Sequence, residues 1–281
     1  MSLAGKTILV TGASRGIGAE VARQAAEVGA TVLLVARSEE ALAEVVAGIE
    51  TRGGRAHAYA CDLSDFEALD ALAEQVLAEH GGVDVLVHNA ARSIRRPIAR
   101  SLERFHDFER TMQLNYFAPV RLTLALLPSL RERGGCVSLV LTLGVMIPGP
   151  YFAAYLASKA ALDAFGDSLA AEFHHEGLRV SSVYMPLVRT EMMAPTKEYA
   201  KRTDIMEVGE AATLVLDGVR EGRRRVLNFT GVRYSFYNRY NADMTTRLLN
   251  FLYTTFPPEG EVSRHPRARR VLERFIGGSP I

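Results

Sequence analysis

Two side chains whose spacing suits proton transfer, Tyr155 and Lys159, stand four positions apart. Residues at that spacing share one face of a helix, so the phenol and the ammonium would project side by side. A tyrosine phenol has a pKa of about 10, too high for ready proton exchange at neutral pH. A neighbouring cation favours the phenolate, so we expect Lys159 to lower the pKa of Tyr155 and make it a general acid or base.

Two polar side chains are candidates to work with this pair. Thr142 ends an apolar run, 136–142, that predicts a strand, and it precedes Tyr155 by thirteen residues. Its hydroxyl would hydrogen-bond a substrate carbonyl. Asn115 lies in a helical stretch, 111–130, which we expect to be interrupted near Pro119. A mid-helix asparagine beside a π-type irregularity can turn a backbone carbonyl toward a water.

A glycine-rich stretch near the start of the sequence is typical of a phosphate-binding turn. Apolar residues 7–10 before it predict a buried strand, and residues 21–28 after it predict a helix. Gly12, Gly16 and Gly18 would let backbone amides touch a dinucleotide pyrophosphate at the positive end of that helix. A tight turn without a ligand is the alternative, but the βα unit that follows favours cofactor binding.

The end of the second predicted strand, 31–35, indicates which dinucleotide is bound. An acid there would accept a hydrogen bond from the ribose 2′-hydroxyl of NAD. The sequence instead has Ala36 and Arg37, and Arg15 in the glycine turn adds a second guanidinium. Both would hold a 2′-phosphate by charge-assisted bonds, which favours NADP(H). The alternative is that both arginines are solvated surface charges.

The elements that must position these residues alternate along the chain. We expect helices over 39–52, from about 64, and over 206–220, and strands over 55–61, 83–87, 178–183 and 225–229. Alternating strands and helices predict an α/β fold, a doubly wound parallel sheet of Rossmann type. We assign residues 1–230 to this catalytic domain and residues 231–281 to a C-terminal helical extension.

Composition excludes several classes of protein. The 281 residues are 48% hydrophobic and 23% charged with a net charge of +1, so no bulk charge favours nucleic acid. Cys61 and Cys136 lie in apolar runs, and two buried free thiols suit a reducing cytoplasm. The sequence shows no metal-binding spacing, signal peptide or membrane span, so we expect no metal and a cytoplasmic protein.

The glycine pattern Thr-Gly-x3-Gly-x-Gly, combined with Thr142 and the Tyr-x3-Lys helix, resembles the short-chain dehydrogenase/reductase family. The resemblance covers about residues 5 to 230 and implies an oxidoreductase that uses a nicotinamide cofactor. Several positions depart from the family pattern. Thr142 replaces the usual serine, and Met185-Pro186 replaces Pro-Gly. In the family's Asn-Asn-Ala-Gly motif, His88 and Ala91 differ, while Asn89 and Ala90 match. We expect His88 to be structural or to act behind the site.

The resemblance also assigns roles to single residues. Asn115 would hold a proton-relay water, and Lys159 would contact the nicotinamide ribose. Asp62 would reach the adenine, although it or a neighbour could instead cap a helix. Asn89 would bridge strand ends. The implied cofactor-binding set is Gly12, Ser14, Arg15, Gly16, Ile17, Gly18, Arg37, Asp62, Leu63, Asn89, Ala90, Tyr155, Lys159, Val188 and Thr190.

Three segments, 92–96, 105–117 and 185–197, narrow the resemblance to bacterial fatty acyl-CoA reductases of this superfamily. They imply a small-molecule substrate with an apolar carbonyl, such as an acyl thioester or long-chain aldehyde. A steroid or polyketide ketone is the alternative, and a cofactor-sensing binding protein is less favoured because the Tyr155–Lys159 pair is intact. We further expect Arg92, Arg95 and Arg96 to bind an anionic part of the substrate. The side chains of Met146, Met192 and Met193 would form apolar walls of the substrate site.

Aromatic residues are concentrated near the C-terminus, over 234–256. Tyr237, Tyr240, Met244, Leu248 and Phe251 follow helical spacing. This pattern predicts an amphipathic helix packed on the domain or on a second subunit, so we expect a homo-oligomer. Peripheral membrane contact is the other interpretation.

Overall fold

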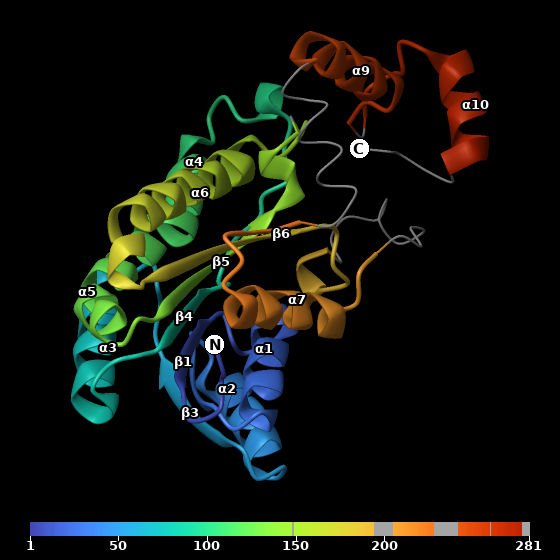
Figure 1. Cartoon of the computed structure of the whole chain (residues 1–281). Coiled ribbons are helices and arrows are strands. Elements are labelled where there is room, and N and C mark those ends of the chain that lie inside the picture. Colours follow the sequence, from blue (N-terminus) through green and yellow to red (C-terminus); the bar gives the residue numbers. More distant parts are fainter. Residues whose placement is uncertain (148, 194–204, 228–240, 259, 277–281) are drawn as a thin grey trace.

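A seven-stranded sheet organises the part of the chain described by the computed structural model, which is residues 1–147, 149–193, 205–227, 241–258 and 260–276. All neighbouring strands pair in parallel, in the order β3-β2-β1-β4-β5-β6-β7 (Figure 1). The strands are β1 (Thr7–Thr11), β2 (Thr31–Ala36), β3 (Arg55–Ala60), β4 (Val85–His88), β5 (Cys136–Thr142), β6 (Arg179–Met185) and β7 (Arg225–Val226). The order reverses between β1 and β4, where ligands bind in open α/β sheets.

Helices cover both faces of the sheet. One face carries α1 (Gly16–Glu27), α2 (Glu39–Glu50) and α7 (Val208–Glu221). The other face carries α3 (Phe66–His80), α4 (Phe105–Met112), α5 (Ala118–Glu132) and α6 (Ala153–Phe173). The doubly wound α/β fold predicted from the sequence is therefore confirmed.

Successive strand residues feed two separate hydrophobic cores. Ile8 and Val10 pack on the side of α1, whereas Leu9 between them packs on the opposite side. All three side chains are completely buried. Strands that are covered on both faces appear in a sequence as unbroken apolar runs, which is why these strands were predictable.

The region around Asn115 contains the π-type irregularity that the sequence predicted. A π-helical segment, Gln113–Phe117, joins α4 directly to α5. Pro119 follows this segment directly, at the start of α5, and the chain stays helical through it. The irregularity is therefore a widened helical turn that contains Asn115.

The C-terminal region contains α9 (Ala242–Thr255) and α10 (Pro266–Ile276). Figure 1 shows both at the end of the molecule away from α2 and β3. The predicted domain boundary at 230/231 and four of the aromatic residues, Tyr234, Phe236, Tyr237 and Tyr240, lie outside the described residues. No helix in the described ranges is both long and apolar enough to cross a membrane. Cys61 and Cys136 are buried free thiols.

Candidate active site

The glycine turn between β1 and α1 has the geometry of a phosphate-binding site. Gly12 and Gly16 have φ angles of 67° and 56°, in the region that favours glycine. A Cβ atom on Gly12 would lie 2.8 Å from the Ala90 Cα, and one on Gly18 would overlap the Gly12 carbonyl. No side chain caps the start of α1, and its first turn has no acid. The first backbone amides of α1 are thus available to bind an anion.

Asn89 bridges the ends of β1 and β4, as the sequence predicted. Its Nδ2 donates to the Thr11 carbonyl at 3.1 Å and to the Gly12 carbonyl at 3.2 Å. The backbone amides of Asn89 and Ala90 donate to Thr11 Oγ1 at 3.0 and 3.1 Å. This role of Thr11 was not predicted, although a polar residue ending a buried strand is a signal for it. These bonds hold the start of the glycine turn against the end of β4.

The two arginines assigned to the ribose phosphate differ in their surroundings. Arg37 follows β2, is exposed, and has no ion-pair partner within the described ranges. The Arg15 Nη1 instead contacts Glu191 Oε2 at 2.5 Å, and both side chains are more than two-thirds exposed. A phosphate at Arg15 would have to displace or share this carboxylate, so Arg37 is the more available cation.

Asp62 and Leu63 follow β3 at the same edge of the sheet. Asp62 Oδ1 accepts from the Ser64 amide at 2.9 Å, while Asp65 caps α3 by accepting from the amides of Glu67 and Ala68. Asp62 is therefore not the helix cap. Leu63 is buried and lines a recess under the switch point that is also lined by Thr11, His88, Ala90, Leu114, Ala118, Pro119 and Leu122.

His88 is a structural residue in this arrangement, as expected. Only 2% of it is exposed, and its Nε2 lies 2.8 Å from Thr123 Oγ1 on α5. Burial, reinforced by the charge of Lys159, lowers the pKa of His88 to about 3. Its imidazole stays neutral at physiological pH and is no proton carrier there.

Lys159 ties α6 to β5. Its side chain is 2% exposed, and its Nζ donates to the Val140 carbonyl at 2.7 Å. Burial lowers the pKa of Lys159 to about 8. This ammonium is close to titration at neutral pH and stands beside the strand that ends in Thr142.

Tyr155 differs from the expectation in one respect. Burial raises the pKa of its phenol to about 12, whereas the sequence predicted a lowered pKa. The reason is that both members of the pair are desolvated, and the ammonium of Lys159 is bonded to a carbonyl. Tyr155 is a protonated phenol in this structure, which suits a proton donor.

Asn115 connects the π-helical segment to the loop after β4 and to α6. Its Oδ1 accepts from the Arg92 amide at 2.8 Å, and its Nδ2 donates to the Arg92 carbonyl at 2.9 Å. The same Nδ2 lies 2.9 Å from Ser158 Oγ, which donates to the Tyr155 carbonyl at 2.7 Å. Asn115 is fully buried, so this network fixes α6 at Tyr155. Ser158 was not predicted from the sequence.

Thr142 ends β5 and starts a short 3-10 turn, Leu143–Val145. Its Oγ1 accepts from the Gly144 amide at 3.2 Å, which leaves the hydroxyl proton free to donate. A Cβ atom on Gly144 would lie 2.6 Å from Leu156 Cδ2, so the turn packs against the residue that follows Tyr155.

The loop after β6 lies against the glycine turn. A Cβ atom on Gly16 would be 3.6 Å from Thr190 Cγ2, and Val188 pairs with Met206 in an isolated bridge. Thr190 therefore lies beside the glycine turn, whereas the bridge to Met206 holds the backbone of Val188. Met192 in the same loop is 51% exposed, so it is not a core residue.

The three arginines predicted to meet an anionic handle are not equivalent. Arg96 forms an ion pair with the buried Asp107 at 3.0 Å. The guanidinium of Arg95 lies over the ring of Tyr151, 4.4 Å from its centre. Arg92 is held through its backbone by Asn115. Two of the three side chains are thus engaged within the protein.

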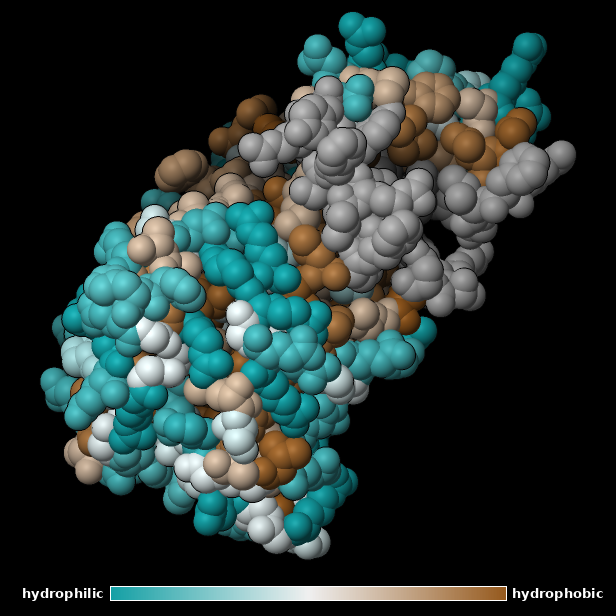
Figure 2. Space-filling view, viewed as in Figure 1, coloured by the Kyte–Doolittle hydropathy of each residue, from teal (hydrophilic) through white to brown (hydrophobic). Residues whose placement is uncertain are grey.

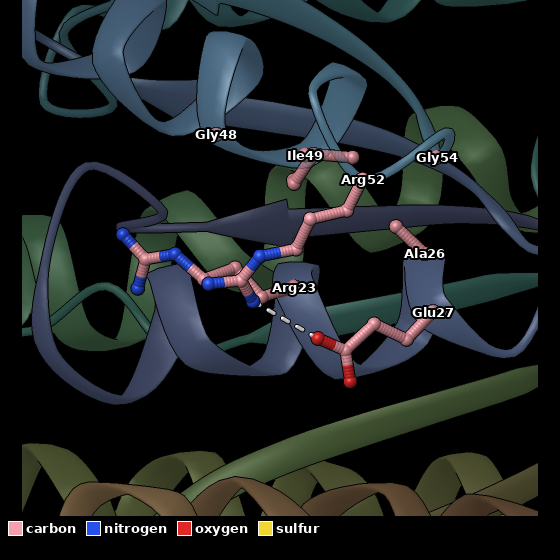
Figure 3. Close-up of a pocket in the computed structure, with 7 residues that line it drawn as sticks. All are labelled: Arg23, Ala26, Glu27, Gly48, Ile49, Arg52 and Gly54. Carbon is pink, nitrogen blue, oxygen red and sulfur yellow. Dashed lines mark hydrogen bonds and ion pairs between the residues drawn. The ribbon is translucent and has the colours of Figure 1, made fainter.

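A separate hollow lies between α1 and α2. Figure 3 shows its lining, in which Glu27 and Arg52 form an ion pair at 3.0 Å. Arg23, Ala26, Gly48, Ile49 and Gly54 complete the lining. These seven residues include none of the predicted site residues, so this hollow is distinct from the candidate active site.

Comparison with known proteins agrees with this geometry. Residues 6–201 match the family model for short chain dehydrogenases. The chain is 45% identical over 279 residues to a fatty acyl-CoA reductase of Acinetobacter baylyi, covering 98% of this chain and 94% of that protein. It is 50% identical over 201 residues to a fatty acyl-CoA reductase of Mycobacterium tuberculosis, covering 71% and 68%.

Solved structures show the same fold. A metagenomic short-chain oxidoreductase crystallised with NADP is 32% identical to this chain, with a TM-score of 0.70 over 81% of this chain and 98% of that one. The family match spans the glycine turn, Asn115, Thr142 and the Tyr155–Lys159 helix. The chain therefore belongs to the short-chain dehydrogenase/reductase family of oxidoreductases.

Proposed function

We propose that this enzyme uses NADP(H) to reduce the carbonyl of an acyl or lipid-like substrate, a fatty acyl-CoA or a long-chain aldehyde. The observation that carries the chemistry is the hydrogen-bonded network from Asn115 through Ser158 to the Tyr155 backbone, together with Lys159, whose ammonium joins α6 to the Val140 carbonyl of β5. The high identity to two reductases named for fatty acyl-CoA supports the substrate class.

The cofactor assignment rests on Ala36 and Arg37. The end of β2 has no carboxylate to accept from a ribose 2′-hydroxyl, and the exposed Arg37 suits a 2′-phosphate. The uncapped start of α1 suits the pyrophosphate. The NADP in the related metagenomic structure supports the same assignment.

Each side chain then has a defined part in the reduction. A bound nicotinamide supplies the hydride to the carbonyl carbon. Thr142 donates its free O–H to the carbonyl oxygen, and Tyr155 delivers the proton to that oxygen. With an aldehyde the product is the alcohol. With an acyl-CoA the product is a hemithioacetal, whose C–S bond then breaks to release an aldehyde and the coenzyme A thiol. Lys159 stabilises the phenolate that remains, and Asn115 positions the relay water through which Tyr155 is reprotonated. The protonated state of Tyr155 in this structure suits the direction of reduction.

The experiment that tests this function measures NADPH oxidation against acyl-CoAs and aldehydes of increasing chain length, with bulky ketones alongside. Each methylene buried in an apolar pocket contributes about 0.8 kcal/mol. We therefore expect kcat/KM to rise roughly fourfold per methylene until the pocket is filled.

Tyr155→Phe serves as the control in this assay, because it removes only the phenolic hydroxyl. It should bind NADPH with unchanged affinity and lose turnover on every substrate. A flat chain-length profile, or faster reduction of bulky ketones, would contradict the acyl assignment. Near-normal turnover by Tyr155→Phe would contradict the proposed acid.

A further inference from the structure

Three arginines surround one buried carboxylate beside the active site. Asp107 on α4 is 3% exposed at its side chain, and it contacts Arg96 Nη1 at 3.0 Å and Arg104 Nε at 3.3 Å through Oδ2. Its Oδ1 contacts Arg110 Nη2, and His106 Nε2 lies 3.5 Å away. Burial acts to raise the pKa of Asp107, but the arginines outweigh it and hold the pKa below its usual value.

This carboxylate cannot satisfy the cations around it. An ionised carboxylate has about four acceptor sites, whereas three guanidiniums carry about fifteen N–H donors. The three arginine side chains are 31%, 41% and 46% exposed, so each stays partly accessible from solvent. Glu103 and Glu109 are exposed in the same segment and offset part of the charge. The segment 92–110 still has six arginines and three acids.

The cluster is connected to the catalytic residues by a short stretch of chain. Asn115 holds both backbone groups of Arg92, and four residues later the Arg96 amide donates to the Tyr151 carbonyl at 2.7 Å. Three apolar residues near the start of α4 are at least 67% exposed: Ile98 and Leu102 before the helix, and Phe105 as its first residue. Figure 2 shows hydrophobic residues over the region where Figure 1 labels α4. Fixed cations thus adjoin an apolar surface.

We propose that Arg96, Arg104 and Arg110 form a phosphate-binding site that takes the phosphates of the coenzyme A carrier. This inference rests on the proposed acyl-CoA reductase function and deepens it. Planar guanidiniums bind phosphate oxygens through paired N–H groups. Asp107 acts as the organiser, because it brings three cations within reach of a single anion and limits their mutual repulsion. The exposed apolar side chains next to them suit the rest of the carrier.

The arrangement favours a discrete ligand over a lipid surface. A bilayer binds basic residues wherever they can approach its headgroups, and it needs no buried carboxylate to hold them in place. Here the three cations are fixed on one side chain, next to the loop that Asn115 positions. A lipid headgroup offers the same phosphate chemistry, so the experiment includes vesicles.

The test titrates coenzyme A into the full chain by calorimetry, comparing wild type with the double variant Arg104→Gln/Arg110→Gln. Arg96 stays in place so that Asp107 keeps a partner. A hydrogen bond to a charged group contributes about 1.5–3 kcal/mol, so we expect the variant to bind at least tenfold more weakly. Arg52→Gln removes a paired, exposed arginine far from the site and should bind like wild type.

Activity assays and vesicles distinguish the remaining outcomes. The double variant should raise KM for acyl-CoA at least tenfold with kcat unchanged, and leave free-aldehyde kinetics unaltered. Equal affinity of wild type and variant for coenzyme A overturns the site, whatever the activity. So does a variant that loses only its binding to phosphatidylglycerol vesicles. Tight coenzyme A binding that depends on these arginines, without acyl-CoA reduction, supports the site and contradicts the proposed function.

Discussion

Lys159 determines how this site should respond to pH. Its ammonium is buried on α6 with the Val140 carbonyl as acceptor, and burial lowers its pKa to about 8. Tyr155 keeps its proton well above that pH, because burial raises its pKa to about 12. Raising the pH through 8 therefore removes the lysine charge first and leaves the phenol protonated.

We expect kcat/KM for reduction to fall as the pH rises, with a midpoint near the Lys159 pKa of about 8. Loss of fold does not explain this decline. An unfolded lysine keeps its proton to about pH 10.4. Between the folded and unfolded pKa values the unfolded state therefore binds more protons, and the free energy of unfolding rises with pH. The measurement is a pH–rate profile for wild type and Lys159→Arg, which should keep its charge and lack this decline. A wild-type profile that stays level from pH 7 to 10 would show that the lysine charge is not required.

We propose that the preference for NADP(H) depends on Arg37. Arg37→Ala should weaken NADPH binding by about 1–3 kcal/mol, the range for a hydrogen bond to a charged group. NADH has no 2′-phosphate, so its affinity should stay the same. Dissociation constants for both cofactors check this, with Arg15→Ala as the comparison. Equal losses for NADPH and NADH would refute the assignment.

At this scale the sequence predicted residue types better than residue environments. The common helix of Tyr155 and Lys159 and the bridging bonds of Asn89 followed from spacing and from the family pattern. The raised pKa of Tyr155 did not, because it depends on burial that spacing does not report. Ser158 and the bonds to Arg92 were missed for a related reason. They join segments far apart in the chain, and nothing in either segment alone indicates the contact.

Elements were predictable where one physical pattern dominated. Strands buried on both faces gave unbroken apolar runs, and β5 has the predicted bounds, Cys136–Thr142. Ends were less accurate: β6 continues to Met185, two residues beyond the predicted 178–183. The predicted interruption near Pro119 is present, but as a π-helical segment, Gln113–Phe117, through which the chain stays helical. Such ends are decided by contacts with neighbouring elements.

The strand–turn–helix unit at the glycine turn gives a prediction about elements. Alanine at Gly18 places a methyl group against the Gly12 carbonyl and Asn89 Nδ2, and backbone cannot move aside cheaply. We expect Gly18→Ala to destabilise the fold by about 1–3 kcal/mol, as overpacking does, and to weaken NADPH binding. Urea unfolding and a cofactor titration measure the two effects.

Gly48 provides the matched control. It lies inside α2, and a Cβ atom there meets nothing within 4 Å. Gly48→Ala should stabilise the protein by about 0.5–1 kcal/mol, because alanine loses less backbone entropy in a helix. If both substitutions shifted the urea midpoint equally, the close approach at Gly18 would not be what requires glycine.

At the scale of the whole molecule, Tyr151 connects the loop after β4 to the C-terminal helices. Its φ of 74° is unusual for a residue with a side chain, and the residue is 5% exposed. Its hydroxyl donates to the Phe256 carbonyl at 3.1 Å, and its ring centre lies 5.3 Å from that of Tyr253. Its own carbonyl accepts from Arg96. One strained residue thus links the loop after β4 to the end of α9.

Tyr151→Phe removes only the hydroxyl, so it tests this link without disturbing the ring. If α9 opens as a local unit, a lost hydrogen bond of about 1 kcal/mol should speed its amide hydrogen exchange roughly fivefold. Tyr59→Phe is the control: its hydroxyl contacts Glu79 at 2.6 Å, near the opposite edge of the sheet, so α9 should be unaffected. If α9 exchanged at the wild-type rate in Tyr151→Phe, the ring contacts would hold the C-terminal helices without the hydroxyl, and the link would lie in packing.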